Sequence, residues 1–246
     1  MITKAHLAPL ALALLVPLAA CGSKQGSSGP AEGGGLTGAP QGDGAGHDTN
    51  PQGVAYPAQH LGHAARGMDG AHRPNATPGS VMPNYKFLGY PGGDPSKGLQ
   101  TVALADYFDP TASKYKVIHL IAAASWCGAC DDETKALLAT LATAQSDYRA
   151  RGVVYLVALI EGDAANFGAT QKDLDSWLTT HKTPFTAMLD PEAAQLGVFF
   201  NADTVPFNAD LDARSMEILD AQTGYEDPNL VTVWIDFVNG SAPAYL

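Results

Sequence analysis

The chain has 246 residues, enough for one good-sized domain or two small ones, and 46% of them are hydrophobic, so part of the chain must form a packed core. Its formal net charge of −11 gives a surface that repels phosphate backbones and anionic lipid headgroups, which excludes nucleic-acid binding and electrostatic adhesion to membranes. The 26 glycines and 17 prolines indicate that another part lies outside any core.

The N-terminus has the pattern of an export signal. Residues 1–20 place Lys4 ahead of an uncharged apolar stretch that is interrupted by two prolines. This stretch is shorter than the roughly 20 apolar residues that span a bilayer, so it is typical of a secretory signal peptide. The letters LAAC at residues 18–21 resemble the lipobox of bacterial lipoproteins, with a chance cysteine behind a plain signal as the alternative.

The lipobox resemblance implies that Cys21 is lipidated and becomes the new N-terminus. Two or more acyl chains anchor a protein stably. The expected location is therefore extracytoplasmic, on the periplasmic side of a bacterial membrane, and Gly22 after the cysteine hints at the outer membrane.

Residues 21–80 are predicted to form a disordered tether. They contain fifteen of the 26 glycines, few large apolar residues and no periodicity that would bury one face. His60, His63, Met68 and His72 carry groups that suit copper, but a small-residue linker lacks the rigid scaffold that coordination needs. We therefore assign no metal site to the tether and keep copper binding there as the minor alternative.

Residues 81–246 are predicted to form one α/β domain. Short strands are expected at 84–90 and 99–108, a buried central strand at 114–124, and a second at 153–160. Helices are expected at 131–150, ended by Gly152, at 170–181 and at 227–240. Further strands are expected at 184–190, 199–212 and 215–221, the last two as a hairpin, so the sheet combines parallel and antiparallel pairs.

Two of the three cysteines form a CxxC pair in the sequence SWCGAC, residues 125–130. With Cys21 assigned to the lipobox, Cys127 and Cys130 remain, and no histidine pair at ligand spacing completes a zinc site. At a strand-to-helix junction the first cysteine meets free backbone N–H groups and the positive end of the helix dipole, which favour a thiolate. Cys127 is thus the expected attacking thiol and Cys130 the resolving one.

Residues 116–240 resemble a thioredoxin-fold domain, and more narrowly the membrane-tethered thiol–disulfide oxidoreductases of the TlpA and ResA type. The resemblance rests on WCGAC after the first core strand, on TVP at residues 204–206 and on the segment between them. It implies a three-layer α/β/α fold with a mixed central sheet, a Cys127–Cys130 disulfide in the oxidised state, and no cofactor. Pro206 would be a cis-proline facing the cysteines, the backbone of Val205 would pair with a client peptide, and Trp126 would shield the pair.

The same resemblance gives Glu133 a role. An acid three residues after the second cysteine lies near the pair in that family, so Glu133 is the candidate general base for Cys130. The alternative is that Glu133 merely complements the helix dipole together with Asp131 and Asp132. Repulsion from these three acids should keep the pKa of Cys127 above about 5. A thiol of that acidity favours a reductant or a mild isomerase over a strong oxidant.

The sequence departs from the family in the motif itself, because Ala129 stands where a proline is common before the second cysteine. The expected partners are client protein thiols and disulfides and a membrane electron donor, and the expected state is a monomer. Three alternatives stay open: a peroxidase, although the PxxxTxxC frame fails for both cysteines; a copper metallochaperone, although its cysteines are spaced by three; and a binding module with a structural disulfide. His119 is expected to be a satisfied core or edge residue.

Overall fold

The structure is a computed structural model that describes residues 46–62, 76, 78–201 and 203–240. The predicted signal peptide, Cys21 and most of the predicted tether lie outside these residues. Among the described residues, no helix combines the length and apolar character that crossing a bilayer requires.

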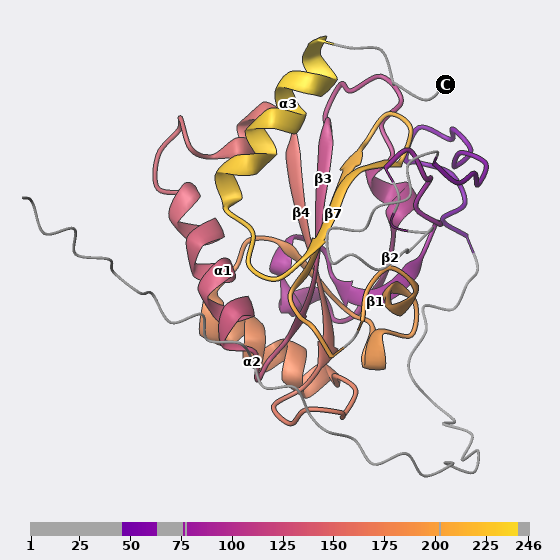
Figure 1. Cartoon of the computed structure of the whole chain (residues 1–246). Helices are drawn as coiled ribbons and strands as arrows, with labels where there is room; N and C mark the ends of the chain where they lie inside the picture. Colours follow the sequence, from indigo (N-terminus) through magenta and orange to yellow (C-terminus); the bar gives the residue numbers. More distant parts are fainter. Residues whose placement is uncertain (1–45, 63–75, 77, 202, 241–246) are drawn as a thin grey trace, which may run out of the picture. The chain divides into compact units, whose positions relative to one another are not determined.

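Seven strands form one mixed sheet in the order β2-β1-β5-β4-β3-β6-β7 (Figure 1). The strands are β1 (Lys86–Tyr90), β2 (Gln100–Ala103), β3 (Val117–Ala124), β4 (Val153–Glu161), β5 (Thr186–Leu189), β6 (Phe207–Asp212) and β7 (Glu217–Thr223). β3, β4 and β5 pair in parallel, while β6 and β7 continue the sheet as an antiparallel hairpin beside β3. The predicted mixed sheet is confirmed, with β3 in its interior.

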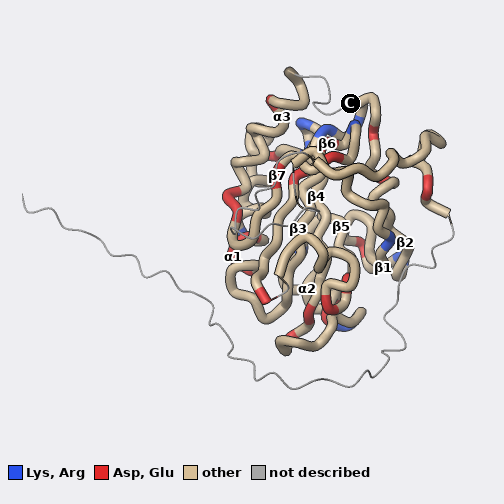
Figure 2. Tube along the Cα trace, turned by 45° about the vertical axis from the view of Figure 1, so that its right-hand side comes forward, with Lys and Arg blue, Asp and Glu red and all other residues tan. Residues whose placement is uncertain are grey.

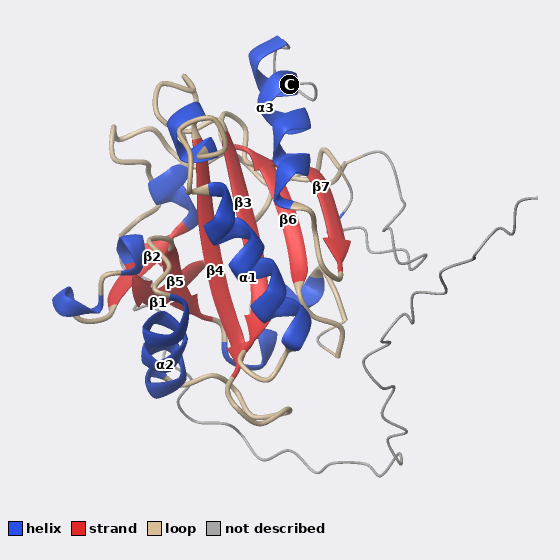
Figure 3. Ribbon diagram, turned by 90° about the vertical axis from the view of Figure 1, so that its left-hand side faces the viewer, coloured by secondary structure: helices blue, strands red, loops and turns tan. Residues whose placement is uncertain are grey.

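The three α-helices of the described residues cover the same face of the sheet (Figure 3). They are α1 (Gly128–Thr140), α2 (Gln171–His181) and α3 (Val231–Gly240). The opposite face is covered by short 3-10 helices, including Leu104–Tyr107 and Leu196–Val198, and by irregular chain. The second outer layer of the expected three-layer fold is therefore present, but among the described residues it contains no α-helix.

Helix α1 begins at the CxxC pair and is shorter than predicted. It ends at Thr140, and a separate 3-10 helix, Tyr148–Arg151, follows before Gly152. Between the two, the hydroxyls of Thr143 and Ser146 lie 2.8 Å apart and bond to nearby backbone. Such local side-chain bonds compete with the helical ladder, which the absence of glycine and proline alone does not reveal.

Residues 46–62 belong to the range predicted as tether, but the structure places them against the domain. Asn50 is 3% exposed and donates its side-chain amide to the carbonyl of Phe108 at 3.1 Å. The Tyr56 hydroxyl donates to the carbonyl of Met82 at 2.7 Å. The prediction of a structureless tether is wrong for this stretch, because isolated anchors of this kind carry no periodic signal.

Candidate active site

The CxxC pair lies at the turn between β3 and α1. Cys127 is the N-cap of α1, and its sulfur accepts the backbone N–H of Cys130 at 3.2 Å. No disulfide joins the two cysteines, and both are 1% exposed. The fold thus brings the two sulfurs together at the end of a helix where N–H groups favour a thiolate.

The two thiols differ in acidity. A hydrogen bond from the Cys130 side chain lowers the pKa of Cys127, and burial raises it. The backbone N–H groups of Cys130 and Ala129 lower it further, so the pKa of Cys127 is about 7. Burial raises the pKa of Cys130, and the neighbouring Cys127 sulfur and Glu133 charge raise it further. At neutral pH about half of the Cys127 side chains are therefore thiolates, while Cys130 stays protonated.

The acids of the first turn of α1 affect the pair less than their number suggests. Asp131 contacts Lys135 on the same helix and lies 3.7 Å from Nε2 of His181 on α2. The charge of Asp131 is thus partly compensated. Figure 2 shows acidic positions on α1 and few basic ones across the described trace, in keeping with the net charge. A Cys127 pKa of about 7 agrees with the predicted value above 5, but burial rather than these carboxylates opposes the lowering.

Val205, which precedes Pro206, lies beside the cysteine pair. The peptide bond between them is cis, as the resemblance implied. The Cys127 thiol donates to the carbonyl oxygen of Val205 across 3.5 Å. The segment before β6, distant in sequence, therefore forms one wall of the site, and Val205 is partly exposed there.

Glu133 lies inside the domain beneath the pair. Its side chain is 1% exposed, Oε1 accepts the backbone N–H of Glu226 at 3.2 Å, and Oε2 is buried with no hydrogen-bond partner among the described residues. Burial raises the pKa of Glu133 to about 7, although His119 and the N–H of Glu226 act against it. Glu133 is thus a buried acid that can change its protonation near neutral pH, which a mere dipole-complementing acid at the surface would not do.

Trp126 is held beside the cysteines by Glu161, at the end of β4. The indole Nε1–H donates to Oε2 of Glu161 at 2.6 Å, and Oε1 of the same carboxylate accepts the backbone N–H of Asn166 at 3.0 Å. Trp126 remains partly exposed and packs against the core on the helical face. The sequence singled out Trp126 but gave no sign of Glu161.

Three buried polar residues near Glu133 were not predicted as parts of the site. His119 of β3 lies opposite Asp210 of β6, with Nδ1 and Oδ1 2.9 Å apart, and Glu226 follows β7. His119 is satisfied in the core as expected. A signal for Asp210 was available: in FNADLD the polar residues alternate with apolar ones, although β6 is buried on both faces.

His119, Asp210 and Glu226 also offer possible metal-ligating atoms within 4.8 Å of one another. The ring of His119 is already engaged with Asp210. Burial lowers the pKa of His119, but Asp210 outweighs burial and the pKa rises to about 9. A protonated imidazole is not a ligand, so the three fit a buried ion pair with an additional acid better than a metal site.

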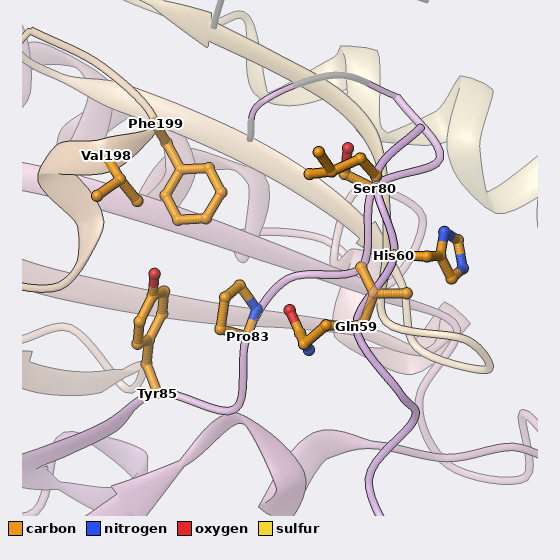
Figure 4. Close-up of a pocket in the computed structure, with 9 residues that line it drawn as sticks. Gln59, His60, Ser80, Pro83, Tyr85, Val198 and Phe199 are labelled. Atoms are coloured by element: carbon orange, nitrogen blue, oxygen red, sulfur yellow. The ribbon is translucent and has the colours of Figure 1, made fainter. Parts of the chain in front are cut away.

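A separate pocket of about 310 Å³ lies on the other face of the sheet (Figure 4). Its walls are mainly apolar, and its residues include Tyr85 and Phe199, whose rings meet edge to face at 6.1 Å. His60 lies at its rim, 3.4 Å from the Glu217 carboxylate. Since Tyr85 and Phe199 pack in the core opposite the helices, this pocket is distinct from the cysteine site.

No protein-family model and no curated protein sequence matches the chain. Among solved structures, the thioredoxin domain of a thiol-disulfide oxidoreductase from Bacteroides vulgatus is 19% identical over 65% of this chain and 98% of that one, with a TM-score of 0.46. StoA from Bacillus subtilis is 18% identical over 62% and 98%, with a TM-score of 0.42. AhpC from Mycobacterium tuberculosis is 17% identical over 67% and 93%, with a TM-score of 0.49.

Likeness at this level says nothing about activity. The fold itself is defined by the chain's own geometry: parallel β3 and β4 in the sheet interior, a cysteine pair at the start of the helix after β3, and a cis-proline before an antiparallel hairpin. The described domain has a thioredoxin-like fold.

Proposed function

We propose that this protein is a thiol–disulfide oxidoreductase that exchanges disulfides with client proteins through Cys127 and Cys130. One observation carries the proposal. Cys127 lies at a helix N-terminus, and a hydrogen bond from the protonated Cys130 thiol helps to lower the pKa of Cys127 to about 7. A pair built only as a structural disulfide would not need this difference in acidity, because ionisation matters only to exchange.

In the reductive direction, the Cys127 thiolate attacks a client disulfide. A bond forms between Cys127 and one client sulfur, and the other client sulfur leaves with the electron pair and takes a proton from water. Cys130 then loses its proton and attacks Cys127, which releases the second client thiol and leaves the Cys127–Cys130 disulfide. Two electrons pass to the client, and a membrane electron donor would return the pair to the dithiol.

Glu133 is the proposed general base for the second step. Cys130 is buried and its pKa is raised, so it needs a nearby acceptor to become a nucleophile. Ile121 occupies the strand position where thioredoxin keeps a buried aspartate, and it offers no acceptor. Glu133, with a pKa raised to about 7, is ionised often enough at neutral pH to take the proton.

Clients would bind along the wall formed by Val205 and Pro206. The extended backbone of Val205 could pair with a client segment as an added strand, and Trp126 would cover the other side. Because Cys127 is 1% exposed, a client sulfur must displace part of this cover to reach it. This requirement favours clients whose disulfides lie in flexible segments.

The proposed location is extracytoplasmic. The signal pattern at residues 1–20 and the lipobox-like cysteine at position 21 support a lipid anchor on the periplasmic side of a bacterial membrane, with Gly22 favouring the outer one. The proposed state is a monomer. A Cys127 pKa near 7 supports a reducing role over a strongly oxidising one.

Trapping tests the proposal. Full-length Cys130→Ala protein, expressed with its signal, should retain mixed disulfides on Cys127 that mass spectrometry identifies, and the Cys127→Ala, Cys130→Ala double variant should retain none. The purified wild type should reduce insulin with a dithiol donor. Failure to form any mixed disulfide or to reduce insulin would overturn the assignment, as would stoichiometric Cu⁺ binding or rapid peroxide consumption that requires Cys127.

A further inference from the structure

A buried cluster of charges lies on the helix-covered face of the sheet. His119 and Asp210, on neighbouring strands β3 and β6, form an ion pair with side chains only 3% and 2% exposed. Glu226, which is 6% exposed, brings a carboxylate oxygen within 4.8 Å of the paired atoms. The cluster therefore combines one base with two acids inside the domain.

Glu226 links this cluster to the cysteine site. Its backbone N–H holds Oε1 of Glu133, while its own carboxylate lies at the His119–Asp210 pair. Oε2 of Glu133 is buried and lacks a partner among the described residues. Glu133 thus receives a hydrogen bond from the backbone N–H of Glu226, and its pKa also responds to the charges of His119 and Glu226 and to the side-chain amide of Asn208, which lowers it.

The cluster holds more acid than base. If every carboxyl group were ionised, a single imidazolium would face several negative charges among buried side chains, which is costly. Some carboxyl groups must therefore be protonated near neutral pH, and the pKa of Glu133 and that of Glu226 are both raised by burial to about 7. The groups that surround the cluster come from every adjacent element: Cys130 and Glu133 of α1, His119 of β3, Tyr155 of β4, Asp210 of β6, Asp220 of β7 and Glu226.

We propose that His119 and Glu226 are positioning residues that act in opposite directions on the protonation of Glu133, and so set the pH at which Cys130 resolves the mixed disulfide. The inference rests on the proposed function and deepens it. His119, held as a cation by Asp210, stabilises the Glu133 carboxylate. Glu226, when ionised, destabilises that carboxylate by like-charge repulsion.

The step under this control is balanced as follows. The Glu133 carboxylate takes the proton from the Cys130 thiol, and the Cys130 sulfur forms a bond with the Cys127 sulfur. The bond between Cys127 and the client sulfur breaks, and the electron pair leaves with the client, which takes a proton from water. Glu133 then releases its proton to solvent. The rate of attack by Cys130 therefore depends on the fraction of Glu133 that is ionised before the step.

Two substitutions that remove charges of opposite sign test the proposal, because residues with only a structural role would not shift the Glu133 midpoint in opposite directions. Removing the negative charge in Glu226→Gln should lower the midpoint of Glu133, and removing the positive charge in His119→Gln should raise it, each by about one pH unit. The matched control is Asp236→Asn on α3, an acid that is 76% exposed and paired with Arg151 at 3.5 Å. It should leave the midpoint unchanged, and Glu226→Asp should restore most of the wild-type value.

Two readouts separate this inference from the proposed function. The first is the carboxyl titration of Glu133 in the reduced protein, followed by NMR with ¹³C-labelled glutamate and assigned with Glu133→Gln. The second is stopped-flow reaction with 5,5′-dithiobis(2-nitrobenzoate), in which the second release of thionitrobenzoate reports attack by Cys130. Both midpoints should move down in Glu226→Gln and up in His119→Gln.

Midpoints that stay fixed, or that move the same way in both variants, would overturn the inference even if the protein exchanges disulfides. A shift of the wild-type NMR midpoint by one equivalent of Zn²⁺ would also overturn it, because the cluster would then be a cation site. Opposed NMR shifts without insulin reduction would uphold the coupling and reject the proposed function. If the variants do not fold, the wild-type titration decides: Glu133 and Glu226 must each titrate in two coupled steps, and two independent single curves would contradict the inference.

Discussion

The sulfur of Cys127 lies 3.5 Å from the carbonyl oxygen of Val205, a contact between residues 78 positions apart in the chain. It joins the start of α1 to the segment before β6, so the sulfur of Cys127 sits between a helix terminus and the chain that leads into β6. The helix end favours the thiolate, and under the proposed function the segment at Val205 would bind the client. The same contact covers the Cys127 sulfur. The rate at which Cys127 reacts with small reagents therefore reports on the geometry of the site.

Alkylation should distinguish the two cysteines. In the reduced protein, the rate of iodoacetamide reaction at Cys127 should rise with pH with a midpoint near 7, while Cys130 stays unmodified over the same range. Because the Cys130 thiol is the main group that lowers the Cys127 pKa, Cys130→Ala should raise the midpoint, and Cys130→Ser, which keeps a donor, should raise it less. Peptide mass spectrometry locates the label, and an unchanged midpoint in Cys130→Ala would contradict this account.

The Trp126–Glu161 hydrogen bond should contribute measurably to stability. Trp126→Phe keeps an aromatic ring but removes the N–H that lies 2.6 Å from Glu161. A bond to a partly buried carboxylate of this kind is worth about 1 kcal/mol or somewhat more. Urea unfolding of Trp126→Phe, Glu161→Gln and the double variant should give a coupling energy of about that size. Purely additive effects would mean that the bond is absent in solution.

Asn50 should anchor residues 46–62 to the domain. Besides its bond to Phe108, its side-chain oxygen accepts the backbone N–H groups of Gln52 and Val54 at 3.1 and 2.8 Å. Asn50→Ala leaves these groups without their partner, at an expected cost of about 1–3 kcal/mol in the free energy of unfolding. Gln52→Ala, at an exposed neighbouring position, serves as the control and should change little. Equal stability of the two variants would mean that residues 46–62 form the flexible tether that the sequence predicts.

Much of the sheet was predictable because its strands are short apolar runs between turn residues. β3 and β4 are buried almost throughout, and helix α2 was marked by Leu174, Trp177 and Leu178 on one face. What could not be predicted depends on contacts that are distant in sequence. The early end of α1 and the packing of Asn50 are set by single hydrogen bonds, which leave no periodic pattern.

The site was predictable where chemistry dictates spacing and unpredictable where tertiary structure assembles it. The spacing of Cys127 and Cys130 predicts a redox pair. Pro206 could be identified only through the family resemblance. Glu226 reaches Glu133 through its backbone N–H, and the pairing of β6 with β3 places Asp210 opposite His119. No local motif encodes that arrangement. Only the polar alternation in β6 gave a local hint.

The buried charges should make stability fall as pH rises. The pKa of His119 is about 9 in the folded protein against 6.5 when unfolded, so its contribution is complete below pH 6.5 and is lost as pH rises through 9. At 1.36 kcal/mol per pKa unit, this contribution is about 3 kcal/mol. Glu133 and Glu226, raised from 4.5 to about 7, likewise contribute stability that is present below pH 4.5 and lost as pH rises through 7.

The thiol of Cys127 opposes this trend, because its lowered pKa adds stability as pH rises between 7 and 9. The measurement therefore uses a Cys127→Ser background, with the free energy of unfolding determined in urea from pH 5 to 9. It should decrease throughout, and His119→Gln should flatten the curve above pH 7, while Glu133→Gln should flatten it below. A curve that is level from pH 7 to 9 before His119 is replaced would mean that this histidine is not protonated in the folded protein, and the ion pair with Asp210 could not then act on Glu133.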